Sequence, residues 1–294
     1  MIAVLLIALR EGLEIALVIV IMLAYLRKSN QSAMNIYVFS GLVLAGIVSI
    51  LIGAGVVVIW GSVEEVVLEI FEGVLVIIAA LLLTTMIVWM QRKGKEISLD
   101  IEESMTSSLQ ENGRWGLIGL SFALVLREGV EIVLFTVALA IREGYQTYVG
   151  LTLGLILATA VGVGIYRGSL ELSFSAFFKW TSIILILFAA GMLAYGIHEL
   201  QEAGFLIIGP LEIWNINPPS LPGGAVHPLH EDGIIGSLAK SIFGYNGNPS
   251  ALEVTVYLLY LLIMAIYFLK VKNGDSAASP SRSSKTETRV ETVK

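Results

Sequence analysis

Two five-residue segments of this chain combine one arginine and two glutamates in the same order. Residues 10–14 read Arg-Glu-Gly-Leu-Glu, and residues 127–131 read Arg-Glu-Gly-Val-Glu. On a helix, side chains three or four residues apart lie on the same face, so the arginine and both glutamates of each segment are neighbours. Carboxylate oxygens are hard ligands that suit hard cations such as Fe³⁺, Mn²⁺, Mg²⁺ or Ca²⁺ rather than Cu⁺. The spacing therefore indicates a paired carboxylate site for a hard cation.

The composition around these segments is that of an integral membrane protein. Of the 294 residues, 56% are hydrophobic and 14% are charged, whereas a soluble domain has about 25% charged residues. The net charge of −6 argues against a nucleic-acid partner. The absence of cysteine excludes disulfides, thiolate metal sites and thiol nucleophiles. The chain has no motif for a redox cofactor, so we expect any oxidation to occur elsewhere or spontaneously.

Seven apolar segments are long enough to cross a bilayer as helices, which takes about 20 residues each. They are residues 1–26, 36–60, 66–90, 115–141, 148–166, 178–197 and 252–269. If the N-terminus lies outside, the inner loops and the C-terminal tail hold 14 of the 18 Lys and Arg residues, and the outer loops hold two. This bias predicts an all-α protein with seven transmembrane helices, N-out and C-in.

The two motifs divide this membrane domain into two halves. They are 117 residues apart, and each lies in the middle of the first helix of a set of three. Because three is odd, the second set must be inverted relative to the first, a design in which transporters place their substrate site near the midplane. The predicted organisation is a seven-helix domain over 1–272, with repeat one at 1–92, repeat two at 115–200, an outer loop at 199–250, a seventh helix at 252–269, and a disordered cytoplasmic tail at 273–294.

The six motif charges need compensation in the membrane. At roughly 2.5–3.5 kcal/mol each, they would cost about 15–21 kcal/mol, more than the total stability of a typical domain. A purely structural interpretation, with two Arg–Glu pairs locking helices together, accounts for Arg10, Arg127 and two of the glutamates. Two glutamates remain, and their charge requires a cation or protons. We therefore favour a cation pathway through Glu11, Glu14, Glu128 and Glu131, with the arginines positioning them.

Other acids and the histidines extend this pathway toward both faces. Glu69 and Glu72 lie three residues apart in the third span, and Glu72 is a candidate fifth carboxylate of the kind that a trivalent ion would need. An outer vestibule that captures metal is predicted from His198, Glu199, Glu202, His227, His230, Glu231 and Asp232. On the inside, Asp100, Glu102 and Glu103 are candidates to receive an exiting cation, but the sequence there favours a solvated charged linker.

The two motifs together resemble those of the high-affinity iron permease family of fungi and bacteria. Three further stretches look like its bacterial branch: His-Glu-Leu-Gln-Glu-Ala-Gly at 198–204, Asp-Gly and Gly-Ser at 232–237, and Gly-Tyr to Pro-Ser at 244–250. The resemblance extends to about residue 272. It implies iron uptake across the plasma membrane, with Fe²⁺ oxidised outside and Fe³⁺ passed to the motif glutamates. The implied partner is a separate extracytoplasmic oxidase or an iron-delivery protein. Iron is then the transported substrate, and membrane lipid is the surrounding partner.

Other functions are compatible with the same residues. A transporter of another cation, such as Mn²⁺ or Pb²⁺, could use the same scaffold. A membrane di-iron enzyme is a further alternative, but such sites typically use Glu-x-x-His pairs on bundle helices, and the motifs contain no histidine. We therefore expect a transporter rather than an enzyme.

Overall fold

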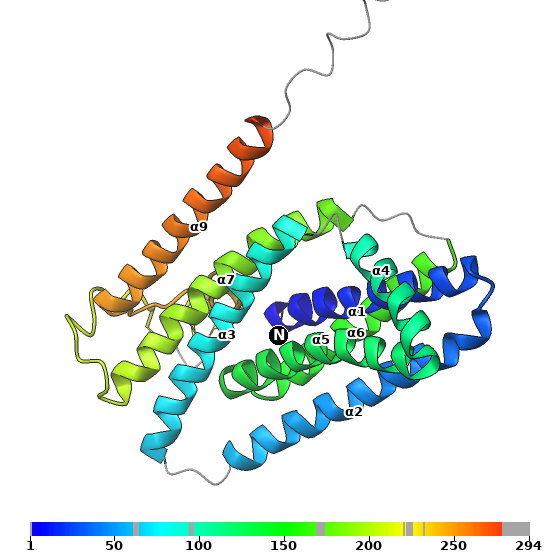
Figure 1. The fold of residues 1–294 in the computed structure, drawn as a ribbon. Coiled ribbons are helices and arrows are strands. Elements are labelled where there is room, and N and C mark those ends of the chain that lie inside the picture. Colours follow the sequence, from blue (N-terminus) through cyan, green and yellow to red (C-terminus); the bar gives the residue numbers. More distant parts are fainter. Residues whose placement is uncertain are drawn as a thin grey trace, which may run out of the picture.

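The computed structural model describes residues 2–60, 65–93, 97–168, 174–219, 221, 226–231 and 233–277. All regular structure in these residues is helical. The helices are α1 (Ile2–Lys28), η1 (Ser32–Met34), α2 (Asn35–Trp60), α3 (Glu65–Lys93), α4 (Ile97–Glu111), α5 (Gly113–Glu143), α6 (Tyr145–Tyr166), α7 (Phe174–Glu202), α8 (Ile234–Phe243) and α9 (Ala251–Ala277) (Figure 1). The all-α class predicted from the sequence is confirmed.

Seven of these helices have 22 residues or more, and each overlaps one of the seven predicted apolar segments. By length and composition, five stretches could cross a membrane: Ser32–Val58, Glu69–Met90, Tyr145–Tyr166, Lys179–Glu202 and Ala251–Lys270. The other two long helices, α1 and α5, contain the charged motifs. α9 continues to Ala277, five residues into the predicted tail, and the rest of that tail lies outside the described residues.

The long helices pack in pairs that join the two halves of the chain. α1 packs mainly against α6, α2 against α5, and α3 against α7, while α9 packs on α7 at the edge of the bundle. If the first three long helices are exchanged with the second three, α1 takes the place of α5, α2 that of α6, and α3 that of α7. The α1–α6 pair then becomes the α5–α2 pair. The exchange also leaves the α3–α7 pair as it is. The packing is therefore symmetric with respect to the two halves.

Small residues allow the close approach of α1 and α6. A Cβ atom added to Gly154 would lie 2.8 Å from the Cβ of Ala8, and one added to Gly162 would lie 2.7 Å from the Cβ of Ala16. Contacts of this kind between small residues are the usual way in which membrane helices associate. Because the residue numbers rise together along both helices, α1 and α6 run in the same direction.

The contacts within the other two pairs give their directions as well. A Cβ atom on Gly41 would lie 2.8 Å from the Cβ of Ser121, and one on Gly53 would lie 3.2 Å from Val133, so α2 and α5 are also parallel. In the third pair, Gly196 of α7 meets Ile77 of α3 while Leu200 meets Gly73. The numbers there run in opposite senses, so α3 and α7 are antiparallel.

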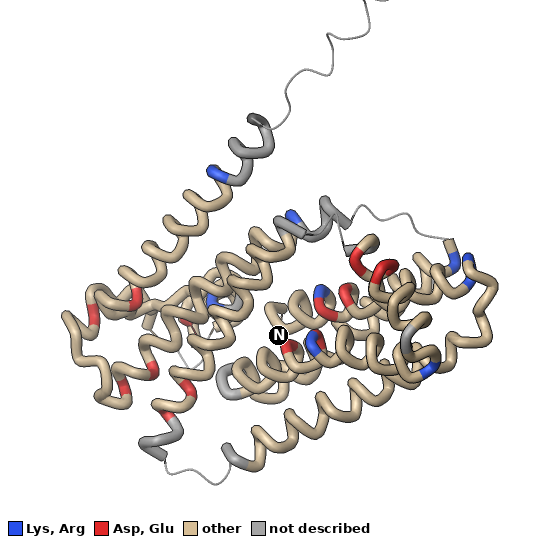
Figure 2. The backbone as a smooth tube through the Cα atoms, in the orientation of Figure 1, with Lys and Arg blue, Asp and Glu red and all other residues tan. Residues whose placement is uncertain are grey.

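Two apolar clusters form the interior. One joins the beginning of α1 to the end of α5, together with α3, α7 and α9, and the other joins the end of α1 to α2, α4 and the beginning of α5. The two charged motifs lie between these clusters, halfway along the bundle. Lys and Arg lie mostly at the ends of the helices away from the acidic ends of α3 and α7 (Figure 2). The molecule therefore has a polar layer in the middle of an apolar body.

Candidate functional site: a buried carboxylate cluster

The first motif lies on α1 and is closed off from solvent. Arg10 and Glu11 are both 0% exposed, and Glu14 is 7% exposed. Nη1 of Arg10 is 3.7 Å from Oε1 of Glu11, and its Nη2 is 3.5 Å from Oε1 of Glu14. Nη1 also donates a hydrogen bond of 2.8 Å to the sulfur of Met86 on α3. The arginine therefore lies against both glutamates of its own motif, as the spacing predicted.

The second motif has the same internal pairing but a more open arginine. Nε of Arg127 is 3.3 Å from Oε1 of Glu131 and 3.8 Å from Oε1 of Glu128. The guanidinium carbon of Arg127 lies 4.7 Å from the ring centroid of Trp89, as in a cation–π contact. The Arg127 side chain is 48% exposed, whereas that of Arg10 is fully buried. The two motifs are therefore alike in sequence, but the arginine of the second is exposed to solvent and that of the first is not.

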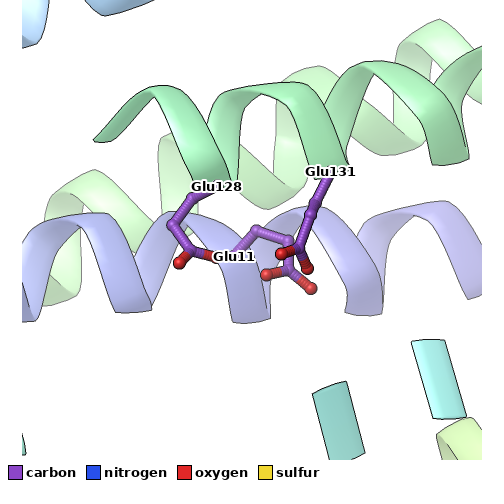
Figure 3. A group of neighbouring side chains, drawn as sticks. All are labelled: Glu11, Glu128 and Glu131. Atoms are coloured by element: carbon purple, nitrogen blue, oxygen red, sulfur yellow. The ribbon is translucent and has the colours of Figure 1, made fainter. Parts of the chain in front are cut away.

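Three glutamates from the two motifs converge between α1 and α5. One carboxylate oxygen from each of Glu11, Glu128 and Glu131 lies within 4.8 Å of the other two (Figure 3). Two oxygens bound to one hard cation at 2.0–2.6 Å can be no more than about 5 Å apart. Among the residues that the structure describes, no other group of three or more His, Asp or Glu side chains is arranged in this way.

The carboxylates of this cluster have buried oxygens without hydrogen-bond partners. Both oxygens of Glu11, Oε2 of Glu128 and Oε2 of Glu131 are in this state, as is Oε1 of neighbouring Glu14. Buried polar atoms in folded proteins nearly always have a partner, and exceptions call for an explanation such as an ion. The cluster is therefore suited to bind a cation, which would satisfy these oxygens.

The remaining predicted residues of the third span lie apart from this cluster. Oε1 of Glu72 accepts a hydrogen bond of 2.8 Å from the hydroxyl of Tyr195 on α7. Glu69 lies one turn before Glu72 on α3 and is partly buried. Both acids lie in the first turns of α3, and neither belongs to the group of converging carboxylates. The structure thus does not bring Glu72 to the cluster as a fifth carboxylate.

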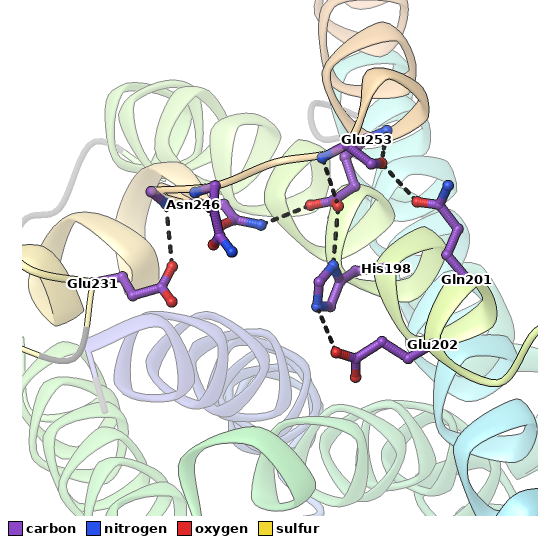
Figure 4. Close-up of polar contacts among 9 residues, drawn as sticks. His198, Gln201, Glu202, Glu231, Asn246 and Glu253 are labelled. Atoms are coloured by element: carbon purple, nitrogen blue, oxygen red, sulfur yellow. Dashed lines mark hydrogen bonds and ion pairs between the residues drawn. The ribbon is translucent and has the colours of Figure 1, made fainter. Parts of the chain in front are cut away.

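His198 at the end of α7 takes part in a polar network (Figure 4). Its Nε2 is 3.3 Å from Oε1 of Glu202, and its Nδ1 is 3.0 Å from Oε1 of Glu253. Glu253 is 3% exposed and also accepts a hydrogen bond of 2.8 Å from Nδ2 of Asn246. Glu199, next to His198, is buried. This network joins α7, α9 and the loop between α8 and α9.

Sequence reasoning missed Glu253 and Tyr195 as members of these contacts. A signal for Glu253 was available, because Ser250 and Glu253 have the spacing of a helix capping box. The backbone N–H of Glu253 donates to the Ser250 hydroxyl, and the backbone N–H of Ser250 donates to the Glu253 carboxylate, each at 3.1 Å. No sequence pattern marked Tyr195, which lies 123 residues from Glu72.

The predicted loop residues make local contacts. Nδ1 of His227 accepts a hydrogen bond from the backbone N–H of Leu229, and Oε2 of Glu231 accepts one from the backbone N–H of Gly247. His230 is partly buried in the same turn. Asp232 lies outside the described residues. Among the described loop residues, His227 therefore stabilises a turn and Glu231 joins two separate parts of the loop, and neither belongs to a group of converging ligands.

The predicted inner acids separate into two kinds. Asp100 of α4 lies on the wall of a cavity of about 180 Å³ that Glu14, Glu128 and Arg127 also line. All three acids are exposed, but Glu102 and Glu103 do not line this cavity. Asp100 is therefore the inner acid that the fold places next to the motif glutamates.

A helical membrane bundle with more carboxylates than arginines halfway along its length, and with buried carboxylate oxygens that lack hydrogen-bond partners, defines the class of ion-handling integral membrane proteins. Comparison with known proteins gives the family. The model of the iron permease FTR1 family matches residues 1–274. The chain belongs to this family, and the resemblance deduced from its motifs is confirmed.

The relatives that the chain resembles include ferrous iron permeases named EfeU. One from Escherichia coli O6:K15:H31 (strain 536 / UPEC) is 32% identical over 280 residues, which is 94% of this chain and 98% of that protein. One from Yersinia pestis is 32% identical over 278 residues, 93% of this chain and 95% of that protein. No solved structure matches the chain.

Proposed function

We propose that this protein is an iron permease of the plasma membrane, and that iron crosses to the cytoplasm through Glu11, Glu14, Glu128 and Glu131. The observation that supports this most directly is the convergence between α1 and α5 of three carboxylates, two of them buried and one partly buried, with unpartnered oxygens. A group that only stabilised the fold would pair its charges. This group instead leaves a net negative charge that a metal cation would balance.

The helix packing supports seven spans in two inverted repeats. If seven helices cross a bilayer in alternation, the first and fifth run in the same direction, as do the second and fourth, whereas the third and sixth are opposed. The pairs α1–α6, α2–α5 and α3–α7 have these directions. The parallel pairs also exchange when the two halves are exchanged, as an inverted repeat requires. The Lys and Arg distribution then favours N-out and C-in.

The charge of the site bears on the form of iron that it accepts. The four motif glutamates exceed the two motif arginines by two negative charges, which balances a divalent ion. Glu72, the candidate for extra charge toward Fe³⁺, is hydrogen-bonded to Tyr195 away from the cluster. The similar EfeU proteins are described as ferrous iron permeases. We therefore propose that Fe²⁺ is the ion presented to the protein, and that the oxidase-dependent Fe³⁺ route is the alternative to test.

Two other candidate functions receive less support. Mn²⁺ has the same charge and ligand preference as Fe²⁺, so competition between the two metals must be measured. A di-iron enzyme would be expected to have histidine ligands, and the group of three carboxylates contains none. Transport of iron therefore remains the function that the site supports best.

The test is uptake of radiolabelled iron in a host that lacks its own iron uptake, at matched membrane abundance. Glu131→Gln removes a cluster carboxylate while keeping the side chain's size, and we expect uptake to fall by at least about tenfold. Glu212→Gln, on an exposed loop residue, is the control for loss of one negative charge. Uptake by Glu131→Gln equal to that of the control would refute the proposal.

The same assay distinguishes the metals and the oxidation states. Iron is supplied directly as Fe³⁺ in the presence of a membrane-impermeant Fe²⁺ chelator. Uptake under these conditions would show that Fe³⁺ is the ion presented, whereas uptake only after the iron is reduced, without the chelator, would show that it is Fe²⁺. Excess Mn²⁺ that abolishes iron uptake, together with uptake of Mn²⁺ itself at the same rate, would favour the broader cation transporter.

A further inference from the structure

The cavity beside the motifs is enclosed by α1, α4 and α5 together with Trp89 and Met90 near the end of α3. Its polar lining consists of Glu14, Asp100, Ser104, Arg127 and Glu128. The volume of about 180 Å³ has room for an ion with several waters, since one water occupies about 30 Å³ in the liquid. Most of the remaining lining is apolar, so the polar groups face one another across a small space.

Two of these groups are buried carboxylates, and one oxygen of each lacks a hydrogen-bond partner. Glu14 is 7% exposed and Glu128 is 8% exposed. Oε1 of Glu14 and Oε2 of Glu128 have no hydrogen-bond partner. Glu14 belongs to α1 and Glu128 to α5, so one motif glutamate from each half of the chain lines the cavity. Both side chains line the cavity, so a ligand in this space would contact one motif glutamate of each half.

The third carboxylate is held in place by the packing of α4. Ile101 and Met105 on this helix are buried in the apolar cluster that includes the end of α1 and the beginning of α5. The hydroxyl of Thr106 is 2.8 Å from that of Tyr25 on α1. These contacts fix the helix on the bundle and leave Asp100 at the exposed rim of the cavity, whereas Glu102 and Glu103, which are also exposed, do not line it.

The charges that line the cavity favour a divalent cation. Three carboxylates and one guanidinium leave two negative charges when all are ionised. Arg127 stacks on Trp89 and is the half-exposed arginine, so it lies on the open side of the motif. Arg10, on the other side, is fully buried. The cluster is therefore open to solvent on the side of Arg127, where α4 lies, and closed on the side of Arg10.

We propose that Glu14, Glu128 and Asp100 form a second, inner binding site for a partly hydrated divalent cation. It lies on the α4 side of the cluster formed by Glu11, Glu128 and Glu131, which is the cytoplasmic side if the N-terminus is outside. Glu128 belongs to both sites, so an ion moves from one to the other by exchanging Glu11 and Glu131 for Glu14 and Asp100. This proposal rests on the proposed transport function.

The experiment compares uptake with binding in the full chain. Radiolabelled iron uptake is measured in the uptake-deficient host for Asp100→Asn, Asp100→Glu, Glu103→Gln and Glu131→Gln. Equilibrium binding of Fe²⁺, kept reduced without oxygen, is measured on the same proteins purified into lipid nanodiscs. Glu103→Gln is the matched control, since it removes an exposed carboxylate from the same helix three residues away.

We expect Asp100→Asn to lower uptake by at least about tenfold and to keep its Fe²⁺ affinity within threefold of the unmodified protein, because the other cluster is intact. Asp100→Glu should restore most of the uptake, and Glu103→Gln should behave as the unmodified protein. Glu131→Gln should lose both uptake and binding.

Three results would overturn the inner site. If Asp100→Asn takes up iron normally while Glu131→Gln does not, the transport function stands and the inner site is wrong. If Asp100→Asn loses binding together with uptake, Asp100 does not act after the first cluster. If Glu131→Gln takes up iron normally, the proposed function fails, and the inner site fails with it.

Discussion

At the scale of single residues, the two motif arginines have the same neighbours in sequence but different surroundings. Arg10 is fully buried and is the nearby positive charge for Glu11 and Glu14. Arg127 pairs with Glu128 and Glu131 but is half exposed and stacked on Trp89. Because water can replace the interactions of an exposed charge and cannot replace those of a buried one, the two arginines should differ in their contribution to stability.

We therefore predict that Arg10→Ala destabilises the protein more than Arg127→Ala. Loss of a buried partner leaves uncompensated charge and costs about 3–5 kcal/mol. Loss of Arg127 should cost less, because its side chain is half exposed and water can take its place beside the glutamates. Melting of the purified proteins in the same detergent, followed by tryptophan fluorescence, measures the difference. Equal melting temperatures for the two variants would show that the burial of Arg10 does not determine how much it contributes to the stability of the protein.

The sequence allowed the motif residues and their pairing to be predicted, because helix periodicity alone determines which side chains of one helix are neighbours. It did not allow the position of Glu72 or the role of Tyr195 to be predicted, because their contact joins two helices far apart in the chain. It likewise gave no means of choosing Asp100 over Glu102 and Glu103. That choice depends on which face of α4 lies against α1 and α5.

At the scale of helices, the approach of α1 to α6 depends on residues without large side chains. A Cβ atom on Gly154 would lie 2.7 Å from the backbone oxygen of Leu5 and 2.9 Å from the backbone nitrogen of Leu9. Backbone atoms cannot move aside as the end of a flexible side chain can. A larger residue at this position must therefore separate α1 from α6 and displace the motif that α1 holds.

We predict that Gly154→Val destabilises the protein by about 1–3 kcal/mol, the usual cost of overpacking, and reduces iron uptake. Gly46→Val on α2 is the matched control, because a Cβ atom there would have no neighbour within 4 Å. Melting temperature and uptake are measured for both at equal membrane abundance. If Gly46→Val is as harmful as Gly154→Val, the effect belongs to valine in a membrane helix and not to the α1–α6 contact.

The long helices were predictable because each contains a long run of apolar residues, which the sequence shows directly. α4 was missed as a helix. It contains four acidic residues and four serines among its 15 residues, so its few apolar positions did not stand out against a solvated linker. The packing of Ile101 and Met105 against the bundle supplies stability that local composition does not reveal.

At the scale of the whole molecule, the parallel pairs α1–α6 and α2–α5 have a consequence for topology. The turn after α1, near Gln31, and the turn after α5, near Gln146, follow the two helices that contain the motifs. If the halves are inverted, these turns must lie on opposite faces of the membrane. Both glutamines are exposed, and the chain has no cysteine, so a single introduced thiol at either position can be labelled without background.

We predict that a membrane-impermeant maleimide labels Gln146→Cys in intact cells and labels Gln31→Cys only after the membrane is opened. The Lys and Arg bias assigns the outer face to the turn near Gln146, and the inverted repeat requires the two turns to differ. Each variant must also retain iron uptake, so that the labelled protein is the active one. The reverse pattern would keep the repeat and overturn the orientation, whereas labelling of both turns from the same side would exclude inverted halves altogether. In that case the two motifs could not reach the midplane from opposite faces.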